Sequence, residues 1–522
     1  MSGEPVIVVG AGPVGMVSAL LLARHGVPTL VLESQRERTA TGSRSICVQR
    51  DVLDILERVG LGATVADVGV TWLRGRTYFR EHQVLEITFP PVADSAFPPW
   101  VNTPQSIVEL LAEQRIAGEP LIDLRRGCEV VGVRQDDGGV TVSTVEDDVR
   151  GSHVVAADGP HSVVRRLLGL TFEGESFPDK FLIADIRADF GFSLPERRFY
   201  FDPPWNPGRQ VLLHPQPDGV YRIDWQVPEE FDLDAERANG GLDKRIRAVV
   251  GDVDYDIVWV SAYRFHQRQV PRMRVGRILL AGDSAHVMSP FGARGLNSGI
   301  SDADNLAWKI ALDRAGEAGP VLLDSYDLER GAAATENIRI TGDTMRFLVP
   351  RTDADREHRT DVLTRAINEP EARADIDSGK LAEPYWYLDS PLTTTDDSVP
   401  QRFPREPGVA RPPVAGVLCP DGRLEWGMRL RELVGPKFVV LKYWCRWKPA
   451  DKWEHELVGQ PVPLEQGDNQ TLVDELRLQP RTVVIVRPDG HIAAVLREPP
   501  EGGIGQLVTS ALRRATGWRL PA

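Results

Sequence analysis

A glycine-rich turn between a predicted strand and a predicted helix, near the start of the chain, constrains the fold most. The stretch PVIVVGAGPVG opens with a β-branched run typical of a buried strand and reaches Gly10, Gly12 and Gly15 in GxGxxG spacing. In such a turn the first glycine permits a tight bend, the second lets a pyrophosphate approach the backbone, and the third allows close packing of helix on strand. The sequence therefore predicts the first βαβ unit of a dinucleotide-binding fold.

The residues that follow extend this unit. Residues 16–25 have helical composition and end at Gly26, where glycine commonly caps a helix, and VPTLVLE reads as a second buried strand ending in Glu33. Glu33 stands where a carboxylate can accept hydrogen bonds from both ribose hydroxyls. The alternative is a glycine-rich turn that binds nothing, and this motif alone does not separate FAD from NAD.

The overall composition excludes some classes of protein. The 522 residues suffice for about two to four domains. The 61 Lys and Arg against 75 Asp and Glu give a formal net charge of −14, which argues against a nucleic-acid partner bound by bulk electrostatics. No apolar stretch is long enough to span a bilayer, and the N-terminus lacks a signal-type apolar run. We expect a cytoplasmic protein with no membrane partner.

The cysteines also favour a reduced intracellular compartment. Cys47, Cys128, Cys419 and Cys445 are widely spread and form no CxxC pair, so neither a disulfide framework nor a zinc site is indicated. A reduced compartment is the simplest environment, and we expect no metal site.

Two later stretches also end strands in polar residues. VVAADGPHSVVRRLLG reads as a strand that ends at Asp158, and GRILLAGDSAH as a buried strand that runs into Asp283. After Asp283 comes a segment rich in Gly, Ser and Asn around Pro290, and then a helical pattern. Taken alone, each has an ordinary explanation, because Asp158 and Asp283 could cap helices and Pro290 could simply break one.

Taken together and in order, these motifs resemble those of the class A flavoprotein monooxygenases, the family of para-hydroxybenzoate hydroxylase and phenol hydroxylase. The shared motifs are GAGPVG, DGxxSxxR and GDSAHxxxPxxxxGxNSGxxDAxNLxWK, and the resemblance covers roughly residues 5–345. VNTPQSIVELL places Gln105 where the family has a flavin-contacting glutamine. LLDSYDLER matches the helix that usually follows the flavin site.

The resemblance implies bound FAD. Asp283 would hydrogen-bond the ribityl chain, and Pro290 with the backbone of 292–297 would lie against the isoalloxazine ring. A helix beginning near Asn297 would point its N-terminus at the N1–C2=O side, where reduced flavin is negatively charged. The predicted cofactor-binding residues are Gly10, Gly12, Val14, Gly15, Glu33, Arg44, Ser45, Gln105, Asp158, Asp283, Pro290, Gly295, Leu296 and Asn297.

Two arginines leave alternatives open. Arg44 sits where the family has an arginine used near the flavin, but it could equally be a surface residue that caps a turn. Arg294 departs from the family pattern; it could place a cation near the flavin or an anionic substrate, and a position in solvent is slightly favoured.

The resemblance also implies the domain organisation. We expect an α/β fold with a Rossmann-like FAD-binding domain in residues 1–70, 101–170 and 272–345, and an interleaved β-sheet substrate domain in 71–100 and 171–271. A helical or linker segment would span 346–413. Residues 414–522 resemble the thioredoxin-like domain of the phenol hydroxylase branch, but Cys445 has no second cysteine two residues on, so disulfide exchange is not expected.

The predicted substrate domain contains an alternating strand, VYRIDWQV. Tyr221, Ile223 and Trp225 share its apolar face, which we expect to line an aromatic-substrate cavity while the polar face meets water. His214 and His266 are conceivable bases for a phenol, although a structural role is the better reading of each. No catalytic residue is assigned.

The sequence thus predicts an FAD-dependent monooxygenase that hydroxylates a phenolic substrate with NADPH or NADH and O2, through a flavin C4a-hydroperoxide as in the family. Only one GxGxxG is present, so the reductant would meet a flavin that swings outward. The alternatives are a same-fold tailoring oxygenase, epoxidising or Baeyer–Villiger, on a polyketide-like aromatic, or a non-enzymatic flavin-binding protein. A flavin halogenase is less consistent, because WxWxIP is absent. The chain could form a homodimer.

Overall fold

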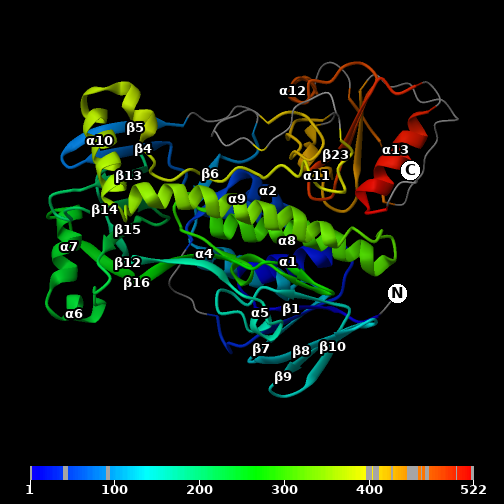
Figure 1. Cartoon of the computed structure of the whole chain (residues 1–522), viewed down its shortest axis with the longest axis horizontal. Coiled ribbons are helices and arrows are strands. Elements are labelled where there is room, and N and C mark those ends of the chain that lie inside the picture. Colours follow the sequence, from blue (N-terminus) through cyan, green and yellow to red (C-terminus); the bar gives the residue numbers. More distant parts are fainter. Residues whose placement is uncertain are drawn as a thin grey trace.

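The computed structural model describes residues 3–38, 45–89, 95–395, 403, 411–424, 427–443, 457–459, 461–464, 469–500 and 503–518. Figure 1 shows a mixed α/β molecule in which the C-terminal residues form a lobe beside two long helices, α8 (Arg294–Ala315) and α9 (Asp324–Leu348). The α/β class predicted from the sequence is confirmed. No helix within the described ranges is long and apolar enough to cross a membrane.

The first of the two large sheets has six strands. Its strand order is β17-β18-β11-β1-β2-β7, and all neighbours are parallel except β17 and β18. The strands are β1 (Val6–Val9), β2 (Thr29–Glu33), β7 (Ile122–Arg126), β11 (His153–Ala156), β17 (Arg274–Val275) and β18 (Ile278–Leu280). The central strands β1, β11 and β18 are fully buried, as their continuous apolar sequences predict.

Helices and a small sheet pack around this sheet. Helix α1 (Pro13–Arg24) packs on α8 and on α4 (Gln105–Ala117), and β8 (Val130–Asp136), β9 (Gly139–Thr144) and β10 (Asp148–Gly151) form a separate three-stranded sheet. The remaining elements of this half are α2 (Arg50–Glu57), α3 (Gly62–Val68), α5 (Val163–Leu167), η1 (Gly282–Ser284) and the pair β3 (Cys47–Gln49) and β6 (Trp100–Asn102).

The chain also forms a larger, eight-stranded sheet, in the order β19-β16-β12-β15-β14-β13-β4-β5. Its strands are β4 (Arg74–Phe79), β5 (His82–Thr88), β12 (Glu173–Ala188), β13 (Glu196–Phe201), β14 (Gln210–Pro215), β15 (Val220–Val227), β16 (Tyr255–Gln269) and β19 (His286–Val287). One face packs against α6 (Leu233–Ala238) and α7 (Gly241–Val250); α10 (Asp353–Asn368), followed by η2 (Pro370–Asp375), packs on β4 and β5.

The C-terminal lobe contains a four-stranded mixed sheet in the order β21-β20-β22-β23. The strands are β20 (Val439–Tyr443), β21 (Val462–Leu464), β22 (Thr482–Val486) and β23 (Ile492–Arg497), and the helices are α11 (Leu430–Leu433), α12 (Gln470–Glu475) and α13 (Ile504–Ala515). Strand β21 runs parallel to β20, while β22 is antiparallel to both of its neighbours. Cys445 lies outside the described residues.

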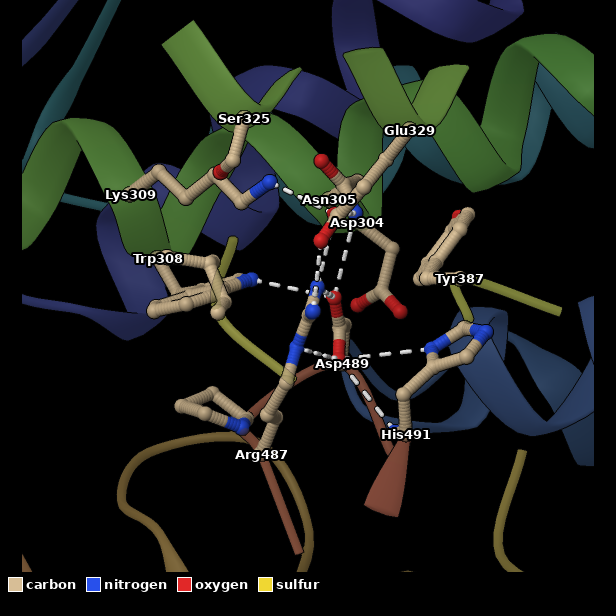
Figure 2. A network of polar contacts seen from close by, with 12 residues as sticks. Asp304, Asn305, Trp308, Lys309, Ser325, Glu329, Tyr387, Arg487, Asp489 and His491 are labelled. Carbon is tan, nitrogen blue, oxygen red and sulfur yellow. Dashed lines mark hydrogen bonds and ion pairs between the residues drawn. The ribbon is translucent and has the colours of Figure 1, made fainter. Parts of the chain in front are cut away.

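A buried cluster of charges joins this lobe to α8 and α9 (Figure 2). We call Lys309, Glu329, Arg487 and Asp489 the interdomain cluster. The Glu329 carboxylate accepts from Lys309 Nζ at 2.7 Å and from both Nη atoms of Arg487 at 2.7 and 2.9 Å, and Arg487 also pairs with Asp489. Each of these side chains is at most 2% exposed. Two cations thus face two carboxylates, so the buried charges balance.

Neutral side chains complete the cluster. Asn305 Nδ2 and Ser390 Oγ donate to Glu329 at 2.8 and 2.6 Å, and Trp308 Nε1 donates to Asp489 at 3.3 Å. These bonds meet the remaining acceptor capacity of the two carboxylates, which a buried ion pair requires to offset its desolvation. Helices α8 and α9 are therefore tied to the C-terminal lobe by a buried polar network in which both carboxylates are bonded.

Candidate active site

A cavity of about 1170 Å³ lies between the two large sheets. On one side it is lined by the loops that follow β1, β2, β11 and β18, at the carboxyl ends of the strands of the six-stranded sheet. On the other side it is lined by side chains of the eight-stranded sheet and by residues 290–296. Open α/β sheets bind ligands at the carboxyl ends of their strands, so this is the expected place for a cofactor.

The glycines of the first motif leave room for a large group. A Cβ built on Gly12 or on Gly295 would meet no protein atom within 4 Å, although both residues line the cavity. By contrast, a Cβ on Gly10 would lie 2.5 Å from the carbonyl oxygen of Ala157, and one on Gly15 would lie 2.0 Å from that of Gly10. Gly10 and Gly15 therefore permit packing of strand and helix, whereas Gly12 and Gly295 keep the cavity itself free. This arrangement fits a dinucleotide cofactor.

Glu33 is fixed at the end of β2. Its carboxylate accepts hydrogen bonds from Ala11 N at 2.7 Å and Gln35 N at 2.8 Å, and the residue lines the cavity. The glycine-rich turn thus holds in place the acid that the motif pairs with a ribose. Val14, in the first turn of α1, also lines the cavity.

Asp158 both lines the cavity and caps α5. It accepts from Ser162 Oγ at 2.5 Å and from the backbone N of Val163 and Val164 at 2.7 and 3.1 Å. The ordinary explanation of this motif, a capped turn, is therefore present in the structure. The cap also places the Asp158 backbone at the wall of the cavity.

Asp283 lies in η1 and lines the cavity. The loop around it is anchored by Asp302 of α8, which accepts from Gly282 N at 2.9 Å, His286 Nε2 at 2.8 Å and Arg330 Nε at 2.6 Å. Burial alone would raise the pKa of Asp302, but Arg330 and His286 outweigh it, and the pKa is lowered. An ionised carboxylate thus fixes the position of Asp283.

Helix α8 begins at Arg294, three residues earlier than expected, after Ala293 in left-handed conformation (φ 56°). Pro290, Gly295 and Leu296 line the cavity here. The first turn of a helix has backbone N–H groups without intrahelical acceptors, and its dipole favours negative charge. An anionic ring edge would be stabilised at this position.

The other four predicted residues have different positions. Asn297 does not line the cavity; its side chain accepts from Gln49 N at 3.0 Å and donates to Cys47 O at 2.9 Å, so it fastens β3 to α8. Gln105 and Ser45 do line the cavity. Arg44 lies outside the described residues.

The preference for Arg294 in solvent is wrong. Arg294 is buried, and its guanidinium donates to Asn337 Oδ1 at 2.5 Å and to the carbonyl oxygens of Lys380 and Leu381 at 2.9 Å each. Burial lowers its pKa to about 10. Its side chain therefore holds the 380–381 segment and α9 against the start of α8.

The expectation for the alternating strand is also wrong in its orientation. Ile223 and Trp225 are fully buried in the core between the sheet and α7, and Tyr221 packs against that core and contacts Phe190. None of the three lines the cavity, because α6 and α7, which follow β15 in the chain, cover the face they occupy. The polar face of β15, with Arg222 and Asp224, lines the cavity instead.

Across this face, polar side chains follow neighbouring strands. Asp185 on β12 pairs with Arg222 on β15, which in turn is opposite His214 on β14, and Arg197 stands on the next strand, β13. Asp224 is near this row, with Oδ2 3.6 Å from His214 Nε2. Alternation marks which residues share a face, but it does not show which strands are neighbours. Sequence reasoning therefore missed Arg197 and Asp224.

Burial shifts the pKa of three groups in this row. It raises the pKa of Asp224 from 3.8 to about 7, lowers that of His214 well below 6.5, and lowers that of Arg197 to about 10. His214 is consequently neutral. His266, the other histidine considered, lines the cavity and bonds to Ser176 Oγ at 2.7 Å.

Comparison with known proteins agrees with this geometry. Residues 4–341 match the FAD binding domain family. Over 351 residues, 63% of this chain and 69% of the relative, the chain is 36% identical to a rifampicin monooxygenase of Streptomyces venezuelae. It is 30% identical to an anhydrotetracycline monooxygenase of Streptomyces rimosus, covering 97% of this chain and 98% of the relative. A 3-(3-hydroxy-phenyl)propionate hydroxylase of Comamonas testosteroni is 32% identical, but only 57% of its length is matched.

Solved structures show the same fold over nearly the whole chain. The flavin-dependent monooxygenase PieE, in complex with FAD and substrate, has a TM-score of 0.82 over 98% of this chain and 99% of its own, at 23% identity. Aklavinone-11 hydroxylase, with FAD and aklavinone, has a TM-score of 0.77 over 98% and 99%, at 21% identity. The likeness therefore includes the C-terminal lobe.

Proposed function

Because the chain belongs to the FAD-binding family of flavoprotein monooxygenases, we propose that it hydroxylates a phenolic aromatic substrate with NADPH or NADH and O2. The observation that carries this proposal is the cavity itself. A glycine-lined dinucleotide cradle and a wall of aromatic and charged side chains border one continuous space. A cofactor in the cradle and a substrate against the wall would therefore meet inside the protein.

The wall has an aromatic end that suits a planar substrate. Phe181, Phe265 and Phe291 line the cavity next to the start of α8, with Phe181 stacked on Phe265 at 4.4 Å between ring centroids. Phe291 meets Phe181 edge-on at 5.5 Å. Aromatic side chains favour offset-stacked and edge-on contacts with other rings, so a substrate ring would be held beside the flavin position.

When bound, FAD supplies the redox chemistry, taking electrons from NAD(P)H and delivering one atom of O2 to the substrate. The residues of this chain would do the rest. Glu33 and the turn at Gly12 would hold the dinucleotide, and the first turn of α8 would stabilise negative charge on the ring edge. The surrounding sheets would exclude water from the substrate.

A second candidate is oxidative tailoring of a larger polycyclic aromatic at the same site. The relatives matched over nearly their full length include an anhydrotetracycline monooxygenase, and the similar structures include aklavinone-11 hydroxylase. The cavity volume of about 1170 Å³ includes the space needed for FAD. This alternative differs in the size of the substrate and in the product, not in the residues that bind the flavin.

We propose in addition that the C-terminal lobe is a thioredoxin-like domain without redox chemistry. A four-stranded mixed sheet with a helix after its last hairpin supports this proposal. Cys419, which the structure describes in this lobe, has its pKa raised by burial and is therefore not a reactive thiolate. Packing against α8 and α9 is the role proposed for the lobe.

The FAD site is tested by Gly12→Val. A side chain at this position meets no protein atom but enters the space assigned to the pyrophosphate, so the variant should fold and fail to retain FAD. Absorbance of the purified protein and its circular dichroism measure the two properties. Gly331→Val, on α9 and equally open, is the matched control and should keep its FAD. A folded Gly12→Val protein with full FAD would refute the site.

The reaction is tested by screening phenols and polycyclic phenols for stimulated NAD(P)H oxidation, followed by product mass. An aromatic product heavier by one oxygen atom, with an unchanged ring system, supports hydroxylation. A ring-expanded or epoxidised product supports the tailoring alternative. If no compound stimulates oxidation in the FAD-loaded protein, the enzymatic proposal fails.

A further inference from the structure

We propose that Asp224 is the general base that removes the proton from the substrate hydroxyl, and that Arg197 holds the resulting phenolate. This inference rests on the proposed hydroxylation and deepens it by assigning the residues that activate the ring. It starts from an imbalance in the row of polar side chains that crosses the eight-stranded sheet.

One charge pair of this row is complete without a substrate. Arg222 Nε and Nη2 donate to Asp185 Oδ1 and Oδ2, each at 2.8 Å, in a bidentate pair. Both residues are buried. A bidentate, charge-balanced pair of this kind has no capacity to spare for a ligand charge. Arg222 therefore shapes the wall and does not neutralise a substrate.

Asp224, by contrast, lacks such a partner within the described residues. Its Oδ1 atom is buried and accepts no hydrogen bond from the part of the chain that the structure describes, and Oδ2 lies 3.6 Å from His214 Nε2, beyond hydrogen-bond distance. The side chain lines the cavity. A carboxyl oxygen without a donor is costly, and 15% of the Asp224 side chain is exposed, so the carboxylate can bond to a group that enters the cavity.

Arg197 is a cation that lacks a negatively charged partner among the described residues. Arg197 lines the cavity, and its guanidinium donates to the carbonyl oxygen of Ser378 at 2.9 Å, but no carboxylate of the described residues forms an ion pair with it. The rings of Trp72 and Phe199 lie beneath it. Arg197 is half-buried, and a cation withdrawn from solvent without a counter-ion favours binding of an anion.

The two incomplete groups suit the activation of a phenol. In the step proposed, the O–H bond of the substrate breaks, its proton passes to the carboxylate of Asp224, and the electron pair stays on the phenol oxygen. A carboxylate and an uncharged phenol become a carboxylic acid and a phenolate, so the net charge of the site is unchanged. Arg197 then gains its counter-ion. A phenolate ring is richer in electrons than a phenol and reacts faster with an electrophilic oxygen.

The protonation behaviour of the site agrees with this step. Burial raises the pKa of Asp224 to about 7, which brings its proton affinity closer to that of a phenol. The groups that face Asp224 are Arg222 and Arg197, which lower its pKa, Asp185, which raises it, and the neutral His214. A base with a pKa near the operating pH is the most effective kind.

The base is tested with Asp224→Asn in the FAD-loaded enzyme. Phenols that stay protonated at the assay pH are compared with nitrophenols that are already ionised. For the protonated phenols, kcat should fall by about 10²–10⁴-fold, the usual contribution of general base catalysis. For the ionised phenols it should change little. Asp256→Asn, exposed on β16 of the same sheet, is the matched control and should retain both activities. Equal losses with both classes, or no loss with either, would overturn the assignment of Asp224.

The cation is tested by binding alone, with Arg197→Met and two probes, 4-nitrophenol in its ionised form and 4-nitroanisole, which cannot ionise. Dissociation constants come from the perturbed flavin absorbance without any reductant. The variant should bind 4-nitrophenolate between about tenfold and a hundredfold more weakly and bind 4-nitroanisole as before. Arg187→Met, exposed on β12, is the control. Equal weakening of both probes, or of neither, would overturn the role of Arg197.

These arms separate this inference from the proposed function. If the wild-type enzyme binds both probes but oxidises no phenol, the hydroxylation proposal fails, and with it the assignment of Asp224, while the binding arm still decides the role of Arg197. If phenols are hydroxylated and Asp224→Asn treats both classes alike, hydroxylation stands and the assignment of Asp224 fails.

Discussion

The interdomain cluster and the cavity wall both withdraw charged side chains from solvent, fully in the cluster and partly in the wall, but they differ in how many of these charges are paired within the chain. In the interdomain cluster, Lys309 and Arg487 balance Glu329 and Asp489, and each charge is bonded within the network. In the cavity wall, within the part of the chain that the structure describes, Asp224 has a buried oxygen without a donor and Arg197 has no ion pair.

This difference in pairing separates charges that stabilise the fold from charges that are available to a ligand. A buried charge that is fully paired within the chain contributes to one packed arrangement and leaves nothing for a ligand. A buried charge that is left incomplete destabilises the free protein, and it persists where a function depends on it. The predictions below test whether the two clusters really differ in this way.

The largest effect is expected for Glu329→Gln. This change leaves Lys309 and Arg487 with a single carboxylate, Asp489, in a fully buried site, and removing one partner of a buried pair costs about 3–5 kcal/mol. The free energy of unfolding, measured in urea, should fall by this amount. Glu357→Gln, exposed on α10, is the control. A loss no larger than that of the control would show that the cluster is not a stabilising network.

An intermediate effect is expected from pH. The folded-state pKa of Asp224 is raised from 3.8 to about 7, so between these values the folded chain holds a proton that the unfolded chain has lost. The contribution of Asp224 to stability is therefore largest below pH 4 and falls as pH rises towards 7, by up to about 1.4 kcal/mol per pH unit. Above pH 7 it stays constant.

Comparing wild type with Asp224→Asn isolates this contribution. Urea unfolding at a series of pH values should show the variant gaining stability relative to wild type across the same window. Parallel curves for the two proteins would mean that Asp224 is ionised throughout and is solvated better than its buried position indicates.

The smallest effect is expected for Arg197→Met and has the opposite sign to that of Glu329→Gln. Removing a half-buried cation that has no counter-ion among the described residues should raise the free energy of unfolding of the substrate-free protein by about 1 kcal/mol. Urea unfolding without substrate measures the gain, with Arg187→Met as the control. A destabilised Arg197→Met protein would indicate that Arg197, like the interdomain cluster, is complete within the fold.

Much of the region around the six-stranded sheet could be predicted from the sequence, because the constraints on it are local. Gly10, Gly12 and Gly15 are close in the chain, and the need for each is set by backbone geometry within one strand–turn–helix unit. The α/β class and the FAD family follow from such motifs. Even here tertiary structure decided details, since Asn297 fastens β3 and Arg294 is buried by α9 and the 380–381 segment.

The side of the eight-stranded sheet that faces the cavity could not be predicted in the same detail. The alternation in VYRIDWQV correctly separates two faces, but which face meets the cavity depends on where α6 and α7 pack. Likewise, Arg197, His214 and Asp224 come from three different strands, and their neighbourhood follows from sheet order. Periodicity within one strand contains no information about this order.

The interdomain cluster also limits how such enzymes can exchange parts. Arg487 and Asp489 belong to the C-terminal lobe, whereas Lys309 belongs to α8 and Glu329 to α9. A recombination event that replaced the lobe alone would leave Lys309 and Glu329 without Arg487 and Asp489, their buried charged partners. Viable chimaeras between relatives should therefore inherit α8, α9 and the lobe from one parent, so that these two helices and the lobe evolve as one unit.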